Sequence, residues 1–108
     1  MFEVYQDKAG EYRFRLKAKN HQNILASEGY AQKAGCLNGI ESVKKNAQDV
    51  SNFELKQTAS GKWMFNLKAG NGQVIGTSQM YESEAGAKNG IESVMNNAPD
   101  AEVKEVEA

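Results

Sequence analysis

Asn38-Gly39-Ile40-Glu41-Ser42-Val43 occurs in the first half of this chain, and the same six residues return as Asn89-Gly90-Ile91-Glu92-Ser93-Val94. The spacing of 51 residues holds on both sides of this stretch. Residues 2–50 align with residues 53–101 without an insertion, and 24 of the 49 aligned positions are identical. Identity at a fixed spacing indicates a tandem duplication. We therefore expect the 108 residues to form one domain, 1–108, made of repeat one, 1–51, and repeat two, 52–108.

Each repeat is predicted to contain three strands. In repeat one these are residues 2–6, 12–18 and 24–27, and the third strand of repeat two is residues 74–78. Residues 12–18 alternate between apolar and cationic side chains, which is typical of a strand with one buried face. Asn71-Gly72 predicts a hairpin with a type I′ turn. His21 occupies the position of Gly72 in repeat one, and we interpret it as a turn residue with positive φ.

A helix is predicted in each repeat, at about 32–47 and 84–98. Ser83 is the expected N-cap of the second helix, and Pro99 follows its last turn. A stripe of apolar residues on each helix should cover the sheet. The helices also carry equivalent glycines, at 35 and 39 and at 86 and 90. Because glycine disfavours a helix, these positions suggest close packing against another backbone, although both repeats could simply have inherited tolerated glycines.

Composition and charge narrow the class of protein. Lys and Arg number 13 against 14 Asp and Glu, so the net charge of −1 argues against a generally basic binder of nucleic acid or membranes. The single cysteine cannot form an internal disulfide, which favours a reducing compartment. The first seven residues lack the order of a signal peptide, and no apolar run approaches the roughly 18 residues of a membrane span. We expect a soluble cytoplasmic protein.

The residues offer little for catalysis. Cys36 aligns with Ala87 on the apolar stripe, so a buried structural role is favoured over a nucleophile. One His and one Cys cannot supply the four ligands of a structural zinc site, and no phosphate-binding loop occurs. The duplicated Glu41 and Glu92 are interpreted as solvated helix residues. We predict a non-enzymatic protein without a cofactor or a metal site.

Binding is the better-supported class of function. The sheet face away from the helices is predicted to carry a cationic and aromatic surface, with Tyr5, Arg13, Arg15, Lys17 and Lys68 as its candidate residues. Such a surface can bind nucleic acid through phosphate contacts and base stacking. However, Glu3 and Glu54 share this face and can form ion pairs with the Arg and Lys side chains across strands. We therefore favour an ordinary solvated face over nucleic-acid binding. A further alternative places a contact surface on matched polar residues, namely Asn38, Asn89, Ser42, Ser93, Tyr30 and Tyr81.

Much of each repeat closely resembles the YegP-like family of small proteins. In repeat one the similar stretch runs from Phe14 through Asn20, Ser27 and Tyr30 to residues 34–47, and repeat two contains its copy. The resemblance implies an α+β fold, a tandem duplication of a β-β-β-α-β unit with one shared antiparallel sheet, two helices and C-terminal strands exchanged between the halves. It implies that residues 101–107 form a strand in the first half and that residues 50–55 form one continuous strand. A duplicated member should be a monomer, since duplication supplies its partner. The family implies no chemistry, so the ligand or partner stays unknown.

Overall fold

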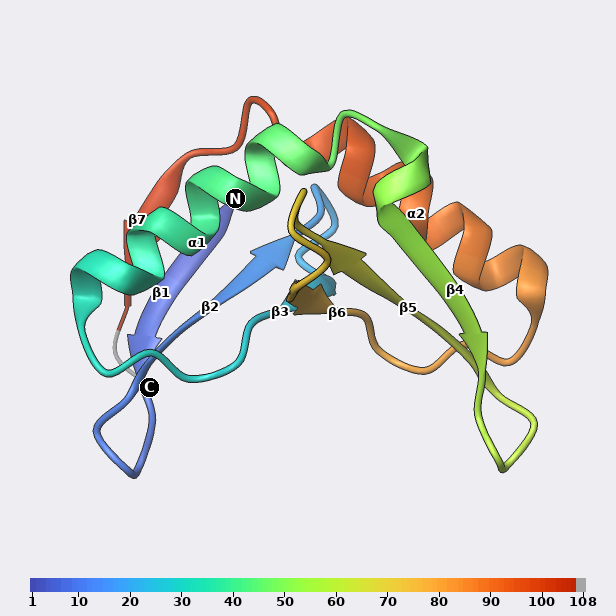
Figure 1. Cartoon of the computed structure of the whole chain (residues 1–108), viewed down its shortest axis with the longest axis horizontal. Coiled ribbons are helices and arrows are strands. Elements are labelled where there is room, and N and C mark those ends of the chain that lie inside the picture. The colour runs from blue at the N-terminus through green and yellow to red at the C-terminus, as the bar shows by residue number, and fades with distance from the viewer. Residues whose placement is uncertain (107–108) are drawn as a thin grey trace.

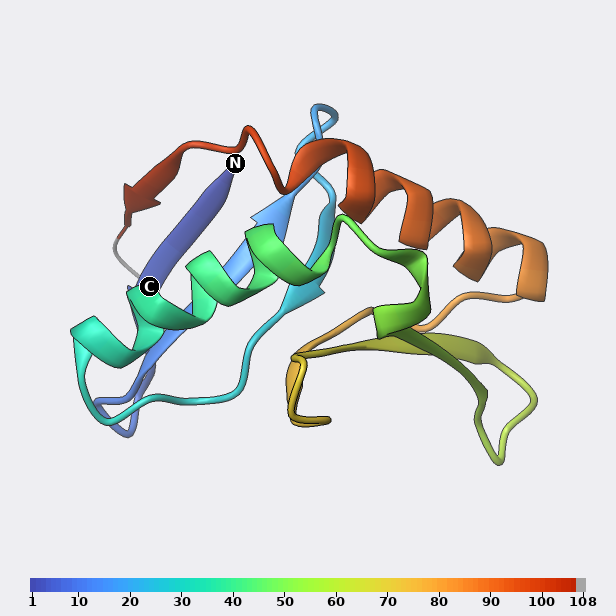
Figure 2. The same cartoon turned by 45° about the horizontal axis from the view of Figure 1, so that its top comes forward.

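The computed structural model describes residues 1–106 and places two helices on one side of a seven-stranded sheet (Figures 1 and 2). The elements of repeat one are β1 (Phe2–Gln6), β2 (Tyr12–Lys17), β3 (Asn23–Ala26) and α1 (Lys33–Asn46). A short 3-10 helix, η1 (Val50–Asn52), leads into repeat two, which contains β4 (Phe53–Gln57), β5 (Trp63–Lys68), β6 (Val74–Thr77), α2 (Glu84–Asn97) and β7 (Val103–Glu105).

The strand order is β4-β5-β6-β3-β2-β1-β7, so the two repeats share one sheet and meet where β3 pairs with β6. This confirms the predicted α+β fold with a duplicated unit. The sheet is antiparallel at every pair except one, because β7 runs parallel to β1. The two halves are arranged as an arch, and the C-terminal ends of α1 and α2 approach each other at its top (Figure 1).

The hairpins use longer turns than the sequence predicted. His21 has a φ of 67° and Gly72 a φ of 83°, as a turn at these positions requires, but Asn71 does not have positive φ. The type I′ turn at Asn71-Gly72 is therefore wrong, since it needs positive φ at both residues. Instead, the Ala69 amide donates to the Gln73 carbonyl over 2.8 Å and encloses a three-residue loop that ends in the left-handed Gly72. In repeat one the Ala18 amide donates to the Gln22 carbonyl over 2.9 Å in the same way. A type I turn followed by a left-handed residue has this form.

The helices follow the predicted boundaries to within a residue or so. Ser83 caps α2 as predicted, because its Oγ accepts a hydrogen bond from the Gly86 amide over 3.0 Å. The predicted close approach at the helical glycines is present, but the neighbour is a tyrosine side chain and not a backbone. A Cβ atom at Gly39 would lie 2.4 Å from Tyr30 Oη, and one at Gly90 would lie 2.3 Å from Tyr81 Oη.

Both repeats contribute to one hydrophobic cluster between the helices and the sheet. Besides the strands of its own repeat, α1 contacts β5 and β6, and α2 contacts β3. The buried members from repeat one include Phe2, Val4, Phe14, Leu16, Cys36, Ile40 and Val43, and those from repeat two include Phe65, Leu67, Ile91 and Val94. None of the helices in the described residues is long and apolar enough to cross a bilayer.

The two ends of the sheet differ. β7 lies beside β1 in the first half, as the resemblance implied, although residue 107 of that predicted strand lies outside the described residues. The prediction of one continuous strand over residues 50–55 is wrong. Asp49 accepts a hydrogen bond from the Ser51 amide over 2.9 Å and starts η1, so the chain coils before β4 begins. Among the described residues, β4 pairs only with β5 and forms the other edge of the sheet.

Candidate functional site

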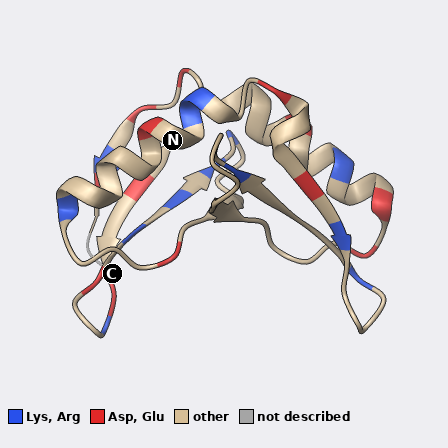
Figure 3. Cartoon of the chain, viewed as in Figure 1, with Lys and Arg blue, Asp and Glu red and all other residues tan. Residues whose placement is uncertain are grey.

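The predicted cationic surface lies on the sheet face opposite the helices, and its Arg and Lys side chains have acidic partners. Arg15 Nε lies 2.7 Å and Lys17 Nζ 3.4 Å from Glu3 Oε1 on the neighbouring strand. Lys68 Nζ lies 3.0 Å from Glu54 Oε2 in repeat two. The prediction that Glu3 and Glu54 pair with these bases is therefore confirmed. Basic and acidic residues are interspersed along the strands (Figure 3).

The remaining candidates on this face are also engaged. Arg13 Nε lies 2.7 Å from Asp7 Oδ2, and the Arg15 guanidinium carbon lies 4.6 Å from the centre of the Tyr5 ring. The hydrogen bond from Arg15 holds the pKa of Glu3 below its usual value, and the hydrogen bond from Arg13 does the same for Asp7. These carboxylates are therefore charged at neutral pH and neutralise the neighbouring cations.

The repeated six-residue signature serves mainly to build each helix. Gly39, Ile40 and Val43 are buried, and so are their copies Gly90, Ile91 and Val94. Asn46 Nδ2 donates to the Ser42 carbonyl over 2.8 Å, and Asn97 donates to the Ser93 carbonyl over 2.7 Å. The exposed members are Asn38, Asn89, Glu41 and Glu92. These exposed helix residues and the cationic strand residues lie on opposite sides of the sheet, so they do not form one surface.

The single cysteine and the single histidine lie in different parts of the fold. Cys36 is fully buried, and burial raises the pKa of its thiol. His21 is exposed in a hairpin loop. Among residues 1–106, no group of three or more His, Cys, Asp or Glu side chains is positioned to hold a metal ion.

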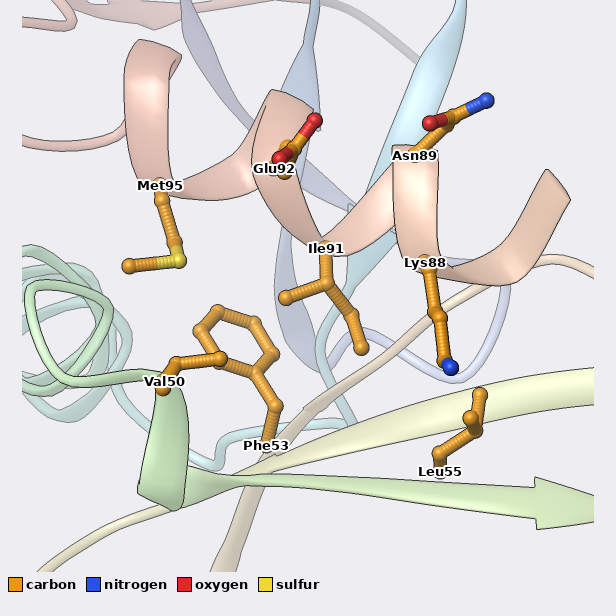
Figure 4. Close-up of a pocket in the computed structure, with 8 residues that line it drawn as sticks. All are labelled: Val50, Phe53, Leu55, Lys88, Asn89, Ile91, Glu92 and Met95. Atoms are coloured by element: carbon orange, nitrogen blue, oxygen red, sulfur yellow. The ribbon is translucent and has the colours of Figure 1, made fainter. Parts of the chain in front are cut away.

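An apolar groove lies between β4 and α2 (Figure 4). It has a volume of about 470 Å³ and is lined by Val50, Phe53, Leu55, Lys88, Asn89, Ile91, Glu92 and Met95. Val50 is 61% exposed, and Phe53 and Leu55 are only half-buried. In repeat one, Phe2 and Val4 occupy the positions of Phe53 and Leu55, but they are 0% and 1% exposed, beside β7.

The backbone of β4 presents free hydrogen-bonding groups along this groove. The Phe65 amide donates to Ser78 Oγ, and the Phe65 carbonyl accepts from the Ser78 amide. Both backbone groups of Phe65 therefore point away from Leu55, the residue opposite it on β4. The amide and carbonyl of Leu55 therefore point outward. Within residues 1–106 they have no hydrogen-bond partner. At the equivalent position, the Val4 carbonyl accepts from the Val106 amide over 2.8 Å.

β1 and β4 also differ at the amide of their first residue. Phe2 N–H donates to the Glu102 carbonyl over 2.7 Å, whereas Phe53 N–H donates to the Val50 carbonyl inside η1. The free part of the β4 edge therefore begins at the Phe53 carbonyl and continues through Leu55 to Gln57. An open edge of this kind can accept a further strand.

Comparison with known proteins places the chain in a family. The family model of the domain of unknown function DUF1508 matches twice, at residues 7–54 and 59–105. The chain belongs to the DUF1508 family. The UPF0339 protein in the ptx operon 5′ region of Stutzerimonas stutzeri is 68% identical over 105 residues, covering 97% of this chain and 95% of that protein. The predicted resemblance to the YegP-like family is confirmed by this relative and by the solved structure of YegP.

Two solved structures share this DUF1508 fold. The solution structure of YegP from E. coli matches with a TM-score of 0.93 at 40% identity, covering 99% of this chain and 92% of that one. The solution structure of SO3888 from Shewanella oneidensis matches with a TM-score of 0.92 at 42% identity, covering 98% and 90%. Neither the family description nor these names state a catalytic activity.

Sequence reasoning singled out the cationic face and missed the groove. A signal was present in the differences between the repeats. Lys44 of repeat one becomes Met95 at the position related by the 51-residue spacing. Replacing a cation with an apolar residue on a helix surface indicates a change in what that surface contacts.

Proposed function

We propose that the chain is a non-enzymatic binding module that takes an extended segment of another protein along β4, with side chains entering the groove below α2. The open edge of β4 carries this proposal, because its pseudo-equivalent, β1, already holds such a segment. There, β7 adds to the sheet in register with Phe2, Glu3 and Val4. Adding a strand to an open sheet edge gains main-chain hydrogen bonds, and the pocket for alternate side chains gives specificity.

We infer no catalytic role, since the one thiol is buried with a raised pKa and the one imidazole lies exposed in a turn. The free Cys36 supports a reducing, cytoplasmic location. The fusion of two units into one sheet supports a monomer, because each repeat already has the other as its partner.

Nucleic-acid binding through the cationic face is the less favoured proposal. Arg13, Arg15 and Lys17 lie side by side on β2, as a phosphate-binding strand would require. Each of them already contacts a carboxylate, and Arg15 covers the Tyr5 ring that a base would need for stacking. A nucleic acid would have to break these contacts before binding.

Selection from a displayed library of random octapeptides tests the binding module. We expect the full chain to enrich peptides and the Met95→Lys variant to lose that enrichment, since lysine makes the groove less apolar. The change is structurally mild because Lys44 occupies the equivalent position of α1. Lys44→Met is the matched control and should leave enrichment unchanged. No enrichment, or enrichment that Met95→Lys does not reduce, contradicts the proposed function.

A further inference from the structure

We infer that the β4 groove selects segments that run parallel to β4 and carry an apolar residue opposite Phe53 and an acidic residue opposite Leu55. This inference rests on the proposed function and adds the direction and chemistry of the segment. Its basis is the strand already seated on the equivalent edge. β7 runs parallel to β1 and places Val103 opposite Phe2 and Glu105 opposite Val4.

The free backbone groups of β4 fit the parallel arrangement. In a parallel ladder, one residue donates its amide to the partner strand and accepts from the residue two positions further along that strand. Leu55 has both groups available, and the free carbonyl of Phe53 and the outward amide of Gln57 continue the pattern on either side. The Phe53 amide is occupied by Val50, so the segment makes its first contact at the Phe53 carbonyl.

The apolar requirement comes from the end of the groove near Phe53. Met95, Ile91 and Val50 surround the Phe53 ring in Figure 4. In repeat one the corresponding ring, Phe2, lies under Lys44, whose Nζ is 6.0 Å from its centre. Val103, which lies opposite Phe2, is 44% exposed. Because Met95 replaces Lys44, the corresponding site beside Phe53 is more apolar and favours an apolar side chain more strongly.

The acidic requirement comes from Lys88, which lies at the position of Leu37 in repeat one. Its side chain points toward Leu55, while Glu92 and Asn89 point away from β4 (Figure 4). Glu84 Oε1 lies 3.3 Å from Lys88 Nζ in an exposed pair one turn apart. An exposed helix pair of this kind is weak, so Lys88 can turn to an acid on the docked segment. Beside β1, Glu105 of β7 pairs with Lys33 of α1. The counterpart of Lys33 in repeat two is Glu84, so Lys88, one turn later on α2, is the cation that can meet an acid on the docked segment.

The probe is a capped peptide, acetyl-Ala-Glu-Val-Lys-Glu-Val-amide, which copies residues 101–106, and its binding to the ¹⁵N-labelled full chain is followed by NMR. We expect shifts of the Leu55 and Gln57 amides. A second peptide with lysine in place of the last glutamate should bind roughly three- to tenfold more weakly, as expected for losing one exposed charge pair and gaining a repulsion. Lys88→Leu, which installs the residue of repeat one, should abolish or reverse this preference, because it also removes the cation that pairs with Glu84. An N-methyl group on the last valine should weaken binding, because that amide is the donor to Leu55.

The outcomes separate this inference from the proposed function. Equal affinities of the two peptides for the unmodified chain overturn the acidic requirement, while the library selection still decides the function independently. Shifts confined to Phe2 and Val4 show that the peptide displaces β7 from β1, and they overturn docking on β4. Sedimentation that shows the chain dimerising, with the Leu55 amide protected before peptide is added, identifies a second copy as the occupant and overturns a partner segment.

Discussion

Gly39→Ala tests the packing that sets the distance between α1 and the sheet. The new Cβ atom would lie 2.4 Å from Tyr30 Oη, 2.9 Å from Tyr30 Cζ and 3.1 Å from Phe14 Cε2. Nonbonded carbon atoms settle at about 3.5–4.0 Å, so the tyrosine ring has to move by roughly 1 Å. That ring stacks on Phe14 with centroids 6.3 Å apart, and Phe14 is fully buried. The ring therefore cannot retreat without disturbing the core.

Overpacking a core costs about 1–3 kcal/mol, and replacing a helical glycine by alanine returns about 1 kcal/mol. We expect Gly39→Ala to lose up to about 2 kcal/mol. Gly35→Ala is the matched control, one turn earlier on the same helix, where the nearest atom of Tyr30 is 3.4 Å away. It should gain up to about 1 kcal/mol. At 4–8 °C per kcal/mol, a difference of about 2 kcal/mol separates the two melting temperatures by roughly 8–16 °C.

Thermal unfolding of both variants, followed by circular dichroism, measures this difference. A Tyr30→Ala background removes the obstructing ring, so Gly39→Ala should there become neutral or stabilising. If Gly39→Ala melts at or above the temperature of Gly35→Ala, the glycine is not required by the tyrosine. The reasoning about both pairs, Gly39 with Tyr30 and Gly90 with Tyr81, is then refuted.

Three further predictions concern the chemistry of single groups. Cys36 should react with iodoacetamide at pH 8 at least about 100-fold more slowly in the native protein than in urea, because the thiol is buried with a raised pKa; equal rates contradict this. Filter binding to single-stranded DNA and RNA at low salt should detect no complex near ~10 μM protein; a tighter complex that Arg15→Ala weakens contradicts the paired state of the cationic face. Glu3→Gln should destabilise the protein at pH 7, and the gap should close as the pH falls below about 4, because a carboxylate with a lowered native pKa stabilises only while it is ionised. A gap that is constant down to pH 3, measured by urea unfolding, contradicts this.

The repeat and the alternation of residues 12–18 predicted three strands and a helix in each repeat, whereas the last strand was expected only from the resemblance to the YegP-like family. Local patterns could also identify Ser83 as a cap and His21 as a turn residue, since both roles depend on neighbours a few positions away. The turn type at Asn71-Gly72 was wrong because the hairpin loop holds three residues, and the hydrogen bonds that enclose it depend on the register of the flanking strands.

The open edge could not be predicted from the repeat, because equal sequences suggested equal surroundings. Within residues 1–106, β7 lies beside β1 of repeat one, and no strand lies on the outer side of β4. The 3-10 helix at Val50 likewise depends on Asp49 capping Ser51, which competes with strand formation. The cationic face was predicted from the sequence together with its acidic partners, because strand periodicity alone places both on one face.

Amide hydrogen exchange at Leu55 tests most directly whether β4 is an open edge. Val4, its equivalent, lies beside β7, and its carbonyl accepts from Val106. We predict that the Leu55 amide of the full chain exchanges at least ~100-fold faster than the Val4 amide under native conditions, at a rate that does not change with protein concentration. If Leu55 is protected as strongly as Val4, the β4 edge is not free, and a binding module built on that edge is contradicted.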